Sequence, residues 1–153
     1  MEIVLTTHRE REAIDVTDLV ASVLHPDGFA WVSCPHTTCA LVLCEADSDM
    51  LADIEKAAGR LLAPIEPFAH HRNDNPNAAA HLWSALAGTQ LLIPIRGGEM
   101  QLGLYQRIVF IELDGPRERR TINIAYVAAL QPGAGLTQDA VDTAARSRRS
   151  TAP

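Results

Sequence analysis

The hexapeptide CALVLC occupies residues 39–44 and is apolar on both alternating faces of an extended chain. Successive side chains of a strand point to opposite sides, so a strand with this pattern is buried above and below. The chain must therefore place one layer on each side of this strand. We expect a sheet that is covered on both faces, and this requirement decides the general architecture.

Outward from this stretch, other segments show the periodicities of strands and helices. Alternating or continuous apolar runs predict strands at residues 2–7, 29–33, 90–95, 101–113 and 121–130. Helical spacing predicts helices at residues 15–24, 47–62 with Asp47 at the N-cap, and 77–88 with Asn77 at the N-cap. Because strands outnumber helices and tight turns connect many of them, we predict an α+β fold. It should be a single domain, mostly an antiparallel β-sheet or sandwich with a few packed helices.

The chain of 153 residues divides into a long ordered part and a short tail. A length of this order suffices for one domain with a substantial core. We place that domain at residues 1–130. Beyond Gln131 the composition shifts to Gly, Ala, Thr, Ser and Arg, so we predict a poorly ordered tail over residues 131–153 with at most a weak helix near residues 139–145.

Composition excludes several classes of function. The net charge of −6 and the aromatic content of 5% argue against a nucleic-acid partner, which normally needs a basic surface and stacking side chains. No apolar run approaches the roughly 20 residues of a membrane span, and the first residues do not resemble a signal peptide. We therefore expect no membrane partner and a cytoplasmic location.

The three cysteines, Cys34, Cys39 and Cys44, are odd in number and lack CxxC spacing. This pattern argues against a disulfide framework or a thiolate zinc site. Buried structural thiols are the favoured interpretation. Cys39 is the one candidate for reactivity, because it lies inside a histidine motif.

Three histidines are the main candidates for chemistry, since imidazole binds metals, carries protons near neutral pH and donates to phosphate. His36 opens the motif HTTCAL, where a polar triplet at the entry to a buried strand is costly without partners. His70 and His81 are eleven positions apart, too far for a two-histidine motif on one helix. They must converge through the polar loop between them, although a solvated loop with incidental histidines fits that segment equally well. We predict that His36, His70 and His81 share one pocket.

Charged residues near these motifs add weaker candidates. Glu45, Asp47 and Asp49 follow the buried strand, and a carboxylate there can orient a histidine or hold a cation. Helix capping explains Asp47 and Asp49 equally well, so Glu45 is the stronger candidate. Arg117, with the neighbouring arginines at 119 and 120, forms a basic patch that suits an anionic ligand, and a role in surface ion pairs is equally compatible. The glycines at 97, 98 and 103 lack a phosphate-loop spacing and are expected in turns or a bulge.

Taken in order, these motifs resemble the YjbQ family. The resemblance rests on HTTCAL at 36–41 followed by Glu45, on His70 and the AHL stretch at 80–82, on IPI at 93–95, on LGLYQ at 102–106 and on ELDGPR at 112–117. It spans nearly all of residues 1–130. The sequence departs from the family pattern at Tyr105, where a tryptophan is usual, and in the tail after Gln131.

The resemblance implies an α+β fold, a homotrimer with a site between subunits, and the activity of a secondary thiamine-phosphate synthase. Such an enzyme joins hydroxymethylpyrimidine pyrophosphate to thiazole phosphate, so the implied ligand is a small phosphorylated metabolite. The implied catalytic residues are His36, Glu45, His81 and Arg117. Substrate binding falls to Thr37, Asn75, Gln106 and Arg117, and metal ligation to His36, His70 and His81.

The chemistry leaves three alternatives open, and the first is the thiamine-phosphate synthase. In that reaction a departing pyrophosphate is normally stabilised by magnesium with Arg or Lys, whereas three histidines favour zinc, so either divalent metal is compatible. A zinc-dependent hydrolase of a small phosphorylated metabolite, with Glu45 as the base, is a second enzymatic interpretation. A trimer that binds a phosphorylated small molecule without turnover is the third.

Overall fold

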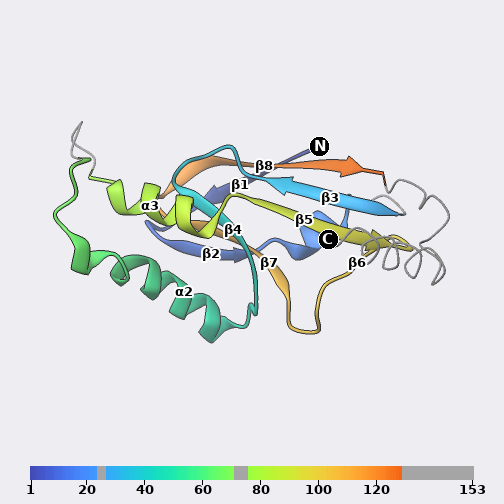
Figure 1. Ribbon diagram of the computed structural model, residues 1–153, viewed down its shortest axis with the longest axis horizontal. Coiled ribbons are helices and arrows are strands. Elements are labelled where there is room, and N and C mark those ends of the chain that lie inside the picture. Colours follow the sequence, from blue (N-terminus) through green and yellow to red (C-terminus); the bar gives the residue numbers. More distant parts are fainter. Residues whose placement is uncertain (24–26, 71–75, 129–153) are drawn as a thin grey trace, which may run out of the picture.

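The computed structural model describes residues 1–23, 27–70 and 76–128, and their elements stack in three layers (Figure 1). The outer sheet has five strands in the order β1-β8-β3-β5-β6 and the inner sheet has three in the order β2-β7-β4. All strand pairings are antiparallel. Helices α2 and α3 form the third layer, against the inner sheet. The chain thus has the α+β fold predicted from its sequence.

The bounds of the elements are as follows. The outer sheet contains β1 (Glu2–Thr7), β3 (Gly28–Ser33), β5 (Gln90–Arg96), β6 (Glu99–Met100) and β8 (Arg117–Val127). The inner sheet contains β2 (Glu12–Asp15), β4 (Cys39–Cys44) and β7 (Arg107–Glu112). The helices are α1 (Thr17–Ala21), α2 (Ser48–Arg60) and α3 (Ala78–Ala87), with a short 3-10 turn at Ala63–Ile65.

The strand β4 is buried on both faces, as its apolar pattern predicts. On one face, Cys39 and Leu41 pack into the core between the two sheets. On the other face, Ala40 packs into a second core that α2 and α3 cover. The inner sheet is therefore the middle layer of the molecule, and the ends of β4 lie where loops from both sides meet.

Some boundaries differ from the predicted ones because side chains compete with regular backbone pairing. Residues 12–15 form a strand paired with β7, and the Asp15 carboxylate accepts the Thr17 N–H at 2.9 Å, so α1 begins only at Thr17. The long strand predicted over residues 101–113 begins only at Arg107. Before it, Gly103 N–H donates to the Gln106 side chain at 2.8 Å and holds the segment in a loop.

Two further differences affect the neighbourhood of the site. β8 begins at Arg117 rather than at residue 121, because the Arg117 N–H donates to the Thr7 hydroxyl at 2.9 Å and extends the pairing with β1. Asn77 precedes α3 but does not cap it through its side chain, which donates to Asp114 at 3.1 Å instead. The predicted tail at residues 131–153 lies outside the described residues.

Candidate functional site

His36 lies in the turn of residues 35–38 that joins β3 of the outer sheet to β4 of the inner sheet. Its Nε2 accepts a hydrogen bond of 2.9 Å from the main-chain N–H of Thr121 in β8. Burial lowers the pKa of the His36 imidazole below its ordinary value, and the positive charge of Arg120 lowers it further. A nitrogen that accepts a hydrogen bond carries no proton, so the ring is neutral and protonated on Nδ1. His36 is thus a fixed N–H donor where the two sheets meet.

An ion pair between Glu112 and Arg120 supports the His36 turn and is almost removed from solvent, with residue exposures of 0% and 5%. Arg120 Nε donates to Glu112 at 2.6 Å, and its Nη2 donates to the Thr38 hydroxyl at 2.9 Å. The Thr7 hydroxyl donates to the same carboxylate at 2.9 Å. Burial opposes ionisation of Glu112, but the hydrogen bonds from Arg120 and nearby groups hold the pKa of its carboxyl below the ordinary value. Since Thr38 belongs to the turn, this pair anchors the turn.

Glu112 was not a site candidate from the sequence, and Arg120 was one only as a neighbour of Arg117 in the basic patch. Glu112 is the only acidic residue of the apolar stretch IVFIEL at 108–113, and Arg120 precedes the alternating segment TINI at 121–124. A lone charge in an apolar strand is stable only beside a buried partner, because desolvation of an unpaired ion is costly. The lone charged residue in each of these two segments was therefore the sequence signal for a buried ion pair. The identity of the partner depends on how the two sheets pack, because Glu112 lies in β7 of the inner sheet and Arg120 lies in β8 of the outer sheet.

A cavity of about 620 Å³ opens beside the turn, and we call it the histidine cavity. His36 and Thr37 line it from the turn, while His81 and Ser84 line it from α3. His81 and Ser84 share one side of the helix because they are three positions apart. The other lining residues are Cys34, Pro35, Ala85, Gly88, Thr89 and Gln90. The structure thus brings together His36, Thr37 and His81 of the predicted site and adds Ser84.

His70 does not line the histidine cavity, but its ring contacts the ring of His81, which does. The two rings meet edge to face, with centroids 5.2 Å apart and planes at 81°. His70 lines a separate cavity of about 580 Å³, together with residues that include Arg11, Glu66 and Phe68. The two histidines that flank the polar loop therefore do converge, but His70 does not line the histidine cavity.

The predicted metal site of His36, His70 and His81 is not assembled among the residues that the structure describes. Among residues 1–23, 27–70 and 76–128, no three side chains of His, Cys, Asp or Glu are arranged to hold a metal ion. The Nε2 of His36 is engaged with Thr121, which leaves only Nδ1, the protonated nitrogen. A metal at His36 would need ligands from beyond these described residues.

The three arginines of the basic patch all pair with carboxylates. Arg117 donates to Asp114 at 2.8 Å, and Asp114 also accepts from Asn77 at the start of α3. Arg119 pairs with Glu2 at the surface. Arg117 is half-exposed and lies outside the lining of the histidine cavity. Its link through Asp114 nevertheless ties it to the helix that carries His81.

Glu45 and Gln106 lie at the opposite end of the inner sheet from His36. β4 and β7 pair so that Cys39 faces Glu112 and Cys44 faces Arg107. The six residues of β4 therefore separate Glu45 from the His36 turn by about 20 Å at roughly 3.3 Å per residue. Within a single chain Glu45 therefore does not reach His36, and its role as a base or as the group that orients a histidine stays a prediction. Asn75, another predicted binding residue, lies outside the described residues.

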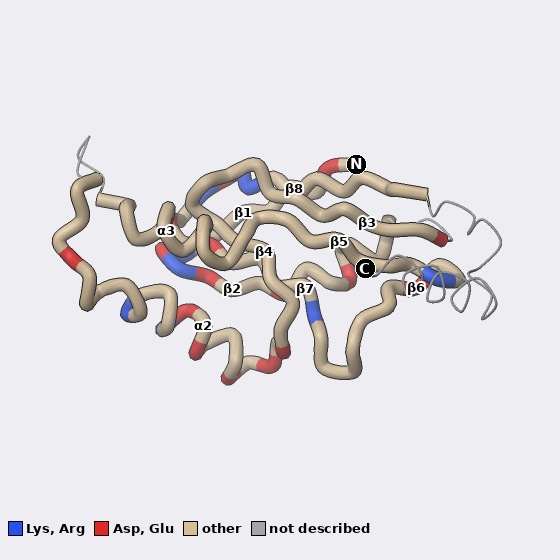
Figure 2. The backbone as a smooth tube through the Cα atoms, viewed as in Figure 1, with Lys and Arg blue, Asp and Glu red and all other residues tan. Residues whose placement is uncertain are grey.

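Charge distribution sets these two ends of the inner sheet apart. Acidic positions follow one another along α2 and the segment before it, where Glu45 lies (Figure 2). Negative groups of this kind repel an anionic ligand.

The thiols of Cys34 and Cys39 are buried, as predicted, and flank the His36 turn. Their sulfur atoms lie 2.7 Å apart. The contact with Cys39 lowers the pKa of the Cys34 thiol, while the contact with Cys34, together with burial, raises the pKa of the Cys39 thiol. Cys39 was a candidate for reactivity from its place in the histidine motif, whereas Cys34 was not.

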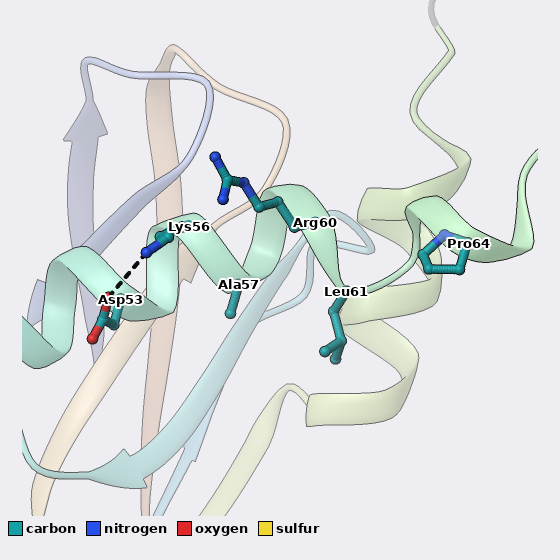
Figure 3. Close-up of a pocket in the computed structure, with 6 residues that line it drawn as sticks. All are labelled: Asp53, Lys56, Ala57, Arg60, Leu61 and Pro64. Atoms are coloured by element: carbon teal, nitrogen blue, oxygen red, sulfur yellow. Dashed lines mark ion pairs between the residues drawn. The ribbon is translucent and has the colours of Figure 1, made fainter.

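A further hollow of about 450 Å³ runs along the surface of α2 (Figure 3). Asp53 and Lys56 lie along it and are 4.0 Å apart, and Arg60 and Leu61 continue the same helix face. None of the predicted site residues lines it. Its side chains are those of a solvated helix, so it adds no candidate chemistry.

No helix among the described residues is long and apolar enough to cross a membrane.

Comparison with known proteins gives a consistent result across the domain. A family model described as UPF0047 protein YjbQ-like matches residues 1–129. A UPF0047 protein of Archaeoglobus fulgidus is 42% identical over 123 residues, which cover 80% of this chain and 97% of the relative. The UPF0047 protein YugU of Bacillus subtilis is 36% identical over 121 residues, covering 74% and 88%.

Solved structures show the same similarity. A hypothetical protein of Aeropyrum pernix K1 superposes with a TM-score of 0.77 at 36% identity, covering 84% of this chain and 98% of the other. A YjbQ/UPF0047 family protein of Clostridium acetobutylicum gives a TM-score of 0.75 at 32% identity, covering 83% and 99%.

Proposed function

Because this chain belongs to the YjbQ family, also called UPF0047, we propose that it is an enzyme that binds a small phosphorylated metabolite in the histidine cavity. The observation that carries the proposal is the hydrogen bond from Thr121 to Nε2 of His36. This bond fixes the ring as a neutral donor at Nδ1 without using the nitrogen that carries the proton. A donor held in this way suits an anionic oxygen, because it needs no reorganisation when charge develops.

Other groups of the cavity have the same chemical character. Thr37 and Ser84 offer hydroxyls, and His81 offers a second imidazole from α3. Hydroxyl and imidazole donors around one cavity match the several oxygens of a phosphate or pyrophosphate. Arg117 adds positive charge near the start of α3, to which Asp114 and Asn77 connect it.

For the reaction we propose the transfer that the family resemblance implies, the synthesis of thiamine phosphate. The thiazole nitrogen forms a bond to the methylene carbon of the pyrimidine substrate while the bond from that carbon to the pyrophosphate oxygen breaks. Negative charge builds on the departing pyrophosphate, and its stabilisation lowers the barrier. His36 is the group in the cavity that would supply it, and His81 would donate a further hydrogen bond. Arg117, which lies outside the lining, would contribute through its positive charge.

A divalent metal remains part of the proposal only with ligands from outside the described residues of one chain. Zinc fits if histidines hold it, and magnesium fits if pyrophosphate oxygens supply most ligands. No step proposed for His36, His81 or Arg117 depends on either ion. Elemental analysis of protein purified without added metal tests this part separately.

We further propose that the assembly is a homotrimer with the site between subunits. The outer sheet presents large apolar side chains to solvent, including Trp31 at 42% exposure and Leu92 at 60%. These two residues are paired across β3 and β5, so they form one continuous patch. Burial of such a patch against another copy is favourable. Contacts between copies are also the means by which Glu45 and Gln106 can approach a neighbouring His36.

The test combines turnover with product identity. Purified protein is incubated with hydroxymethylpyrimidine pyrophosphate and thiazole phosphate, and thiamine phosphate is measured by mass spectrometry. Several turnovers by the wild type and by Arg119→Met, with none by His36→Ala, are expected. Hydrolysed substrates without coupling would favour the hydrolase, and stoichiometric binding without any product would favour the non-catalytic trimer.

A further inference from the structure

The buried thiols of Cys34 and Cys39 close the two ends of the turn that carries His36. Cys34 directly follows β3 of the outer sheet, and Cys39 is the first residue of β4 in the inner sheet. Their residue exposures are 4% and 0%, and their sulfur atoms are 2.7 Å apart. This separation exceeds a disulfide bond of roughly 2.05 Å by only about 0.7 Å. A bond between them would join the two sheets with little displacement.

Access to the pair is one-sided. Cys34 lines the histidine cavity, whereas Cys39 is not among the residues that line it. A small reactive molecule in the cavity therefore meets Cys34 first, and Cys39 lies behind it within reach of the same sulfur. This is the arrangement of an attacking thiol followed by a resolving thiol.

We infer that Cys34 and Cys39 form a redox-active dithiol, which a low-molecular-weight disulfide oxidises to a disulfide bond across the His36 turn. The Cys34 thiolate attacks one sulfur of the small disulfide, whose S–S bond breaks, and the released half takes up a proton. The Cys39 thiolate then attacks Sγ of Cys34, and the second half leaves and takes up the other proton. Both cysteines are oxidised, and the small disulfide is reduced to two thiols.

Oxidation acts directly on the His36 turn. In the reduced chain the Cys39 thiol donates to the main-chain carbonyl of His36 over 3.7 Å. A disulfide removes the thiol hydrogen and links both ends of the turn covalently. The position of His36 relative to Thr121 should change with the redox state. This step goes beyond the proposed function, and its test requires no substrate.

Cys44 provides a matched control within the chain. It ends the same strand β4, but it packs with the core under the helices rather than with the core between the sheets. It also lies at the end of β4 away from the cavity. Substitution at Cys44 should therefore leave the reaction of the other two cysteines unchanged.

The experiment treats the full chain with oxidised glutathione, alkylates the remaining thiols and measures intact mass and linked peptides. Before alkylation, wild type and Cys44→Ser should each be about 2 Da lighter than the reduced chain, the mass of two hydrogens. After alkylation, wild type should carry one alkyl group, at Cys44, and digestion should yield a peptide with a disulfide between residues 34 and 39. Cys39→Ser should stop with one glutathione attached at Cys34. Three alkylatable thiols in treated wild type, or linkage through Cys44, would overturn the inference.

Peptide mapping of the wild type decides the pairing even if a cysteine variant does not fold. As a second readout, the Thr121 amide signal in a nuclear magnetic resonance spectrum should shift between the reduced and oxidised wild type. An unchanged signal in a chain shown to be oxidised would overturn the proposed effect on His36.

Discussion

The main-chain N–H of Thr121 and Nε2 of His36 are 85 positions apart in the chain and 2.9 Å apart in space. This bond joins β8 to the turn between the two sheets and holds the ring in one tautomer. It requires a neutral imidazole, because a protonated Nε2 donates and cannot accept.

The bond predicts how stability depends on pH. The pKa of folded His36 lies below its ordinary value near 6.5, chiefly because the ring is buried. The unfolded chain then binds more protons in the window between these two values, so stability rises with pH through that window. The contribution is present above about pH 6.5 and is lost as the pH falls through the folded value. Urea unfolding of wild type over this range should show the decline.

The control is His36→Gln, which cannot titrate. The difference in free energy of unfolding between wild type and this variant should shrink as the pH is lowered below about 6.5. A difference that stays constant with pH would contradict the neutral, hydrogen-bonded ring.

Removal of Arg120 should be one of the most damaging single changes in the chain. Arg120→Met leaves Glu112 buried without its counter-ion, which typically costs about 3–5 kcal/mol. Arg119→Met is the matched control, since that exposed guanidinium pairs with Glu2 and should change stability by at most about 1 kcal/mol. Chemical denaturation measures both, and equal stabilities of the two variants would rule out a structural role for the buried pair.

Most of the fold follows from local pattern in the sequence. The doubly apolar stretch at 39–44 predicted a strand covered on both sides, and β4 lies between two cores. Asp47 was placed correctly as the N-cap of α2, because its carboxylate accepts the N–H groups of Asp49 and Met50. Patterns of this kind need only neighbours in the chain.

The misjudged parts depend on contacts between distant residues. The start of β8 is set by Thr7, and residues 12–15 form a strand because they pair with β7, so that α1 begins only at Thr17. Periodicity reveals neither contact. For the site, the histidine motifs pointed to His36 and His81, which share a cavity. The position of Glu45 could not be judged, because proximity in sequence to a strand does not tell which end of the sheet faces the ligand. The buried partners Glu112 and Arg120 lie in different sheets, and their contact required the packing of those sheets.

The two histidines that flank the polar loop should differ in their contribution to binding. His81→Ala should weaken pyrophosphate binding about tenfold or more, since it removes a lining group of the histidine cavity. His70→Ala should have a smaller effect, because His70 contacts the His81 ring but does not line the histidine cavity. Calorimetric titration with pyrophosphate compares them, and an equal or larger loss for His70→Ala would place the ligand elsewhere.

The exposed apolar patch of the outer sheet should hold the subunits together. Light scattering of wild type should give about three times the chain mass of 16.6 kDa. Leu92→Glu should reduce the assembled fraction, because a carboxylate within a buried interface is strongly unfavourable. Leu61→Glu is the control, because Leu61 is about as exposed as Leu92 but directly follows α2, away from the outer sheet. This variant should leave the measured mass unchanged. A wild-type monomer at micromolar concentration would refute the trimer.

A nuclear magnetic resonance titration of the ¹⁵N-labelled chain with pyrophosphate directly tests whether the histidine cavity binds a phosphorylated ligand. We expect the Nδ1–H signal of His36 and the amide signals of Thr37 and Thr121 to shift together and saturate, while signals near Glu45 in the same subunit change less. Saturable binding that leaves the His36 and Thr121 signals in place, or the absence of binding at millimolar pyrophosphate, would contradict the claim that this cavity takes a phosphorylated ligand.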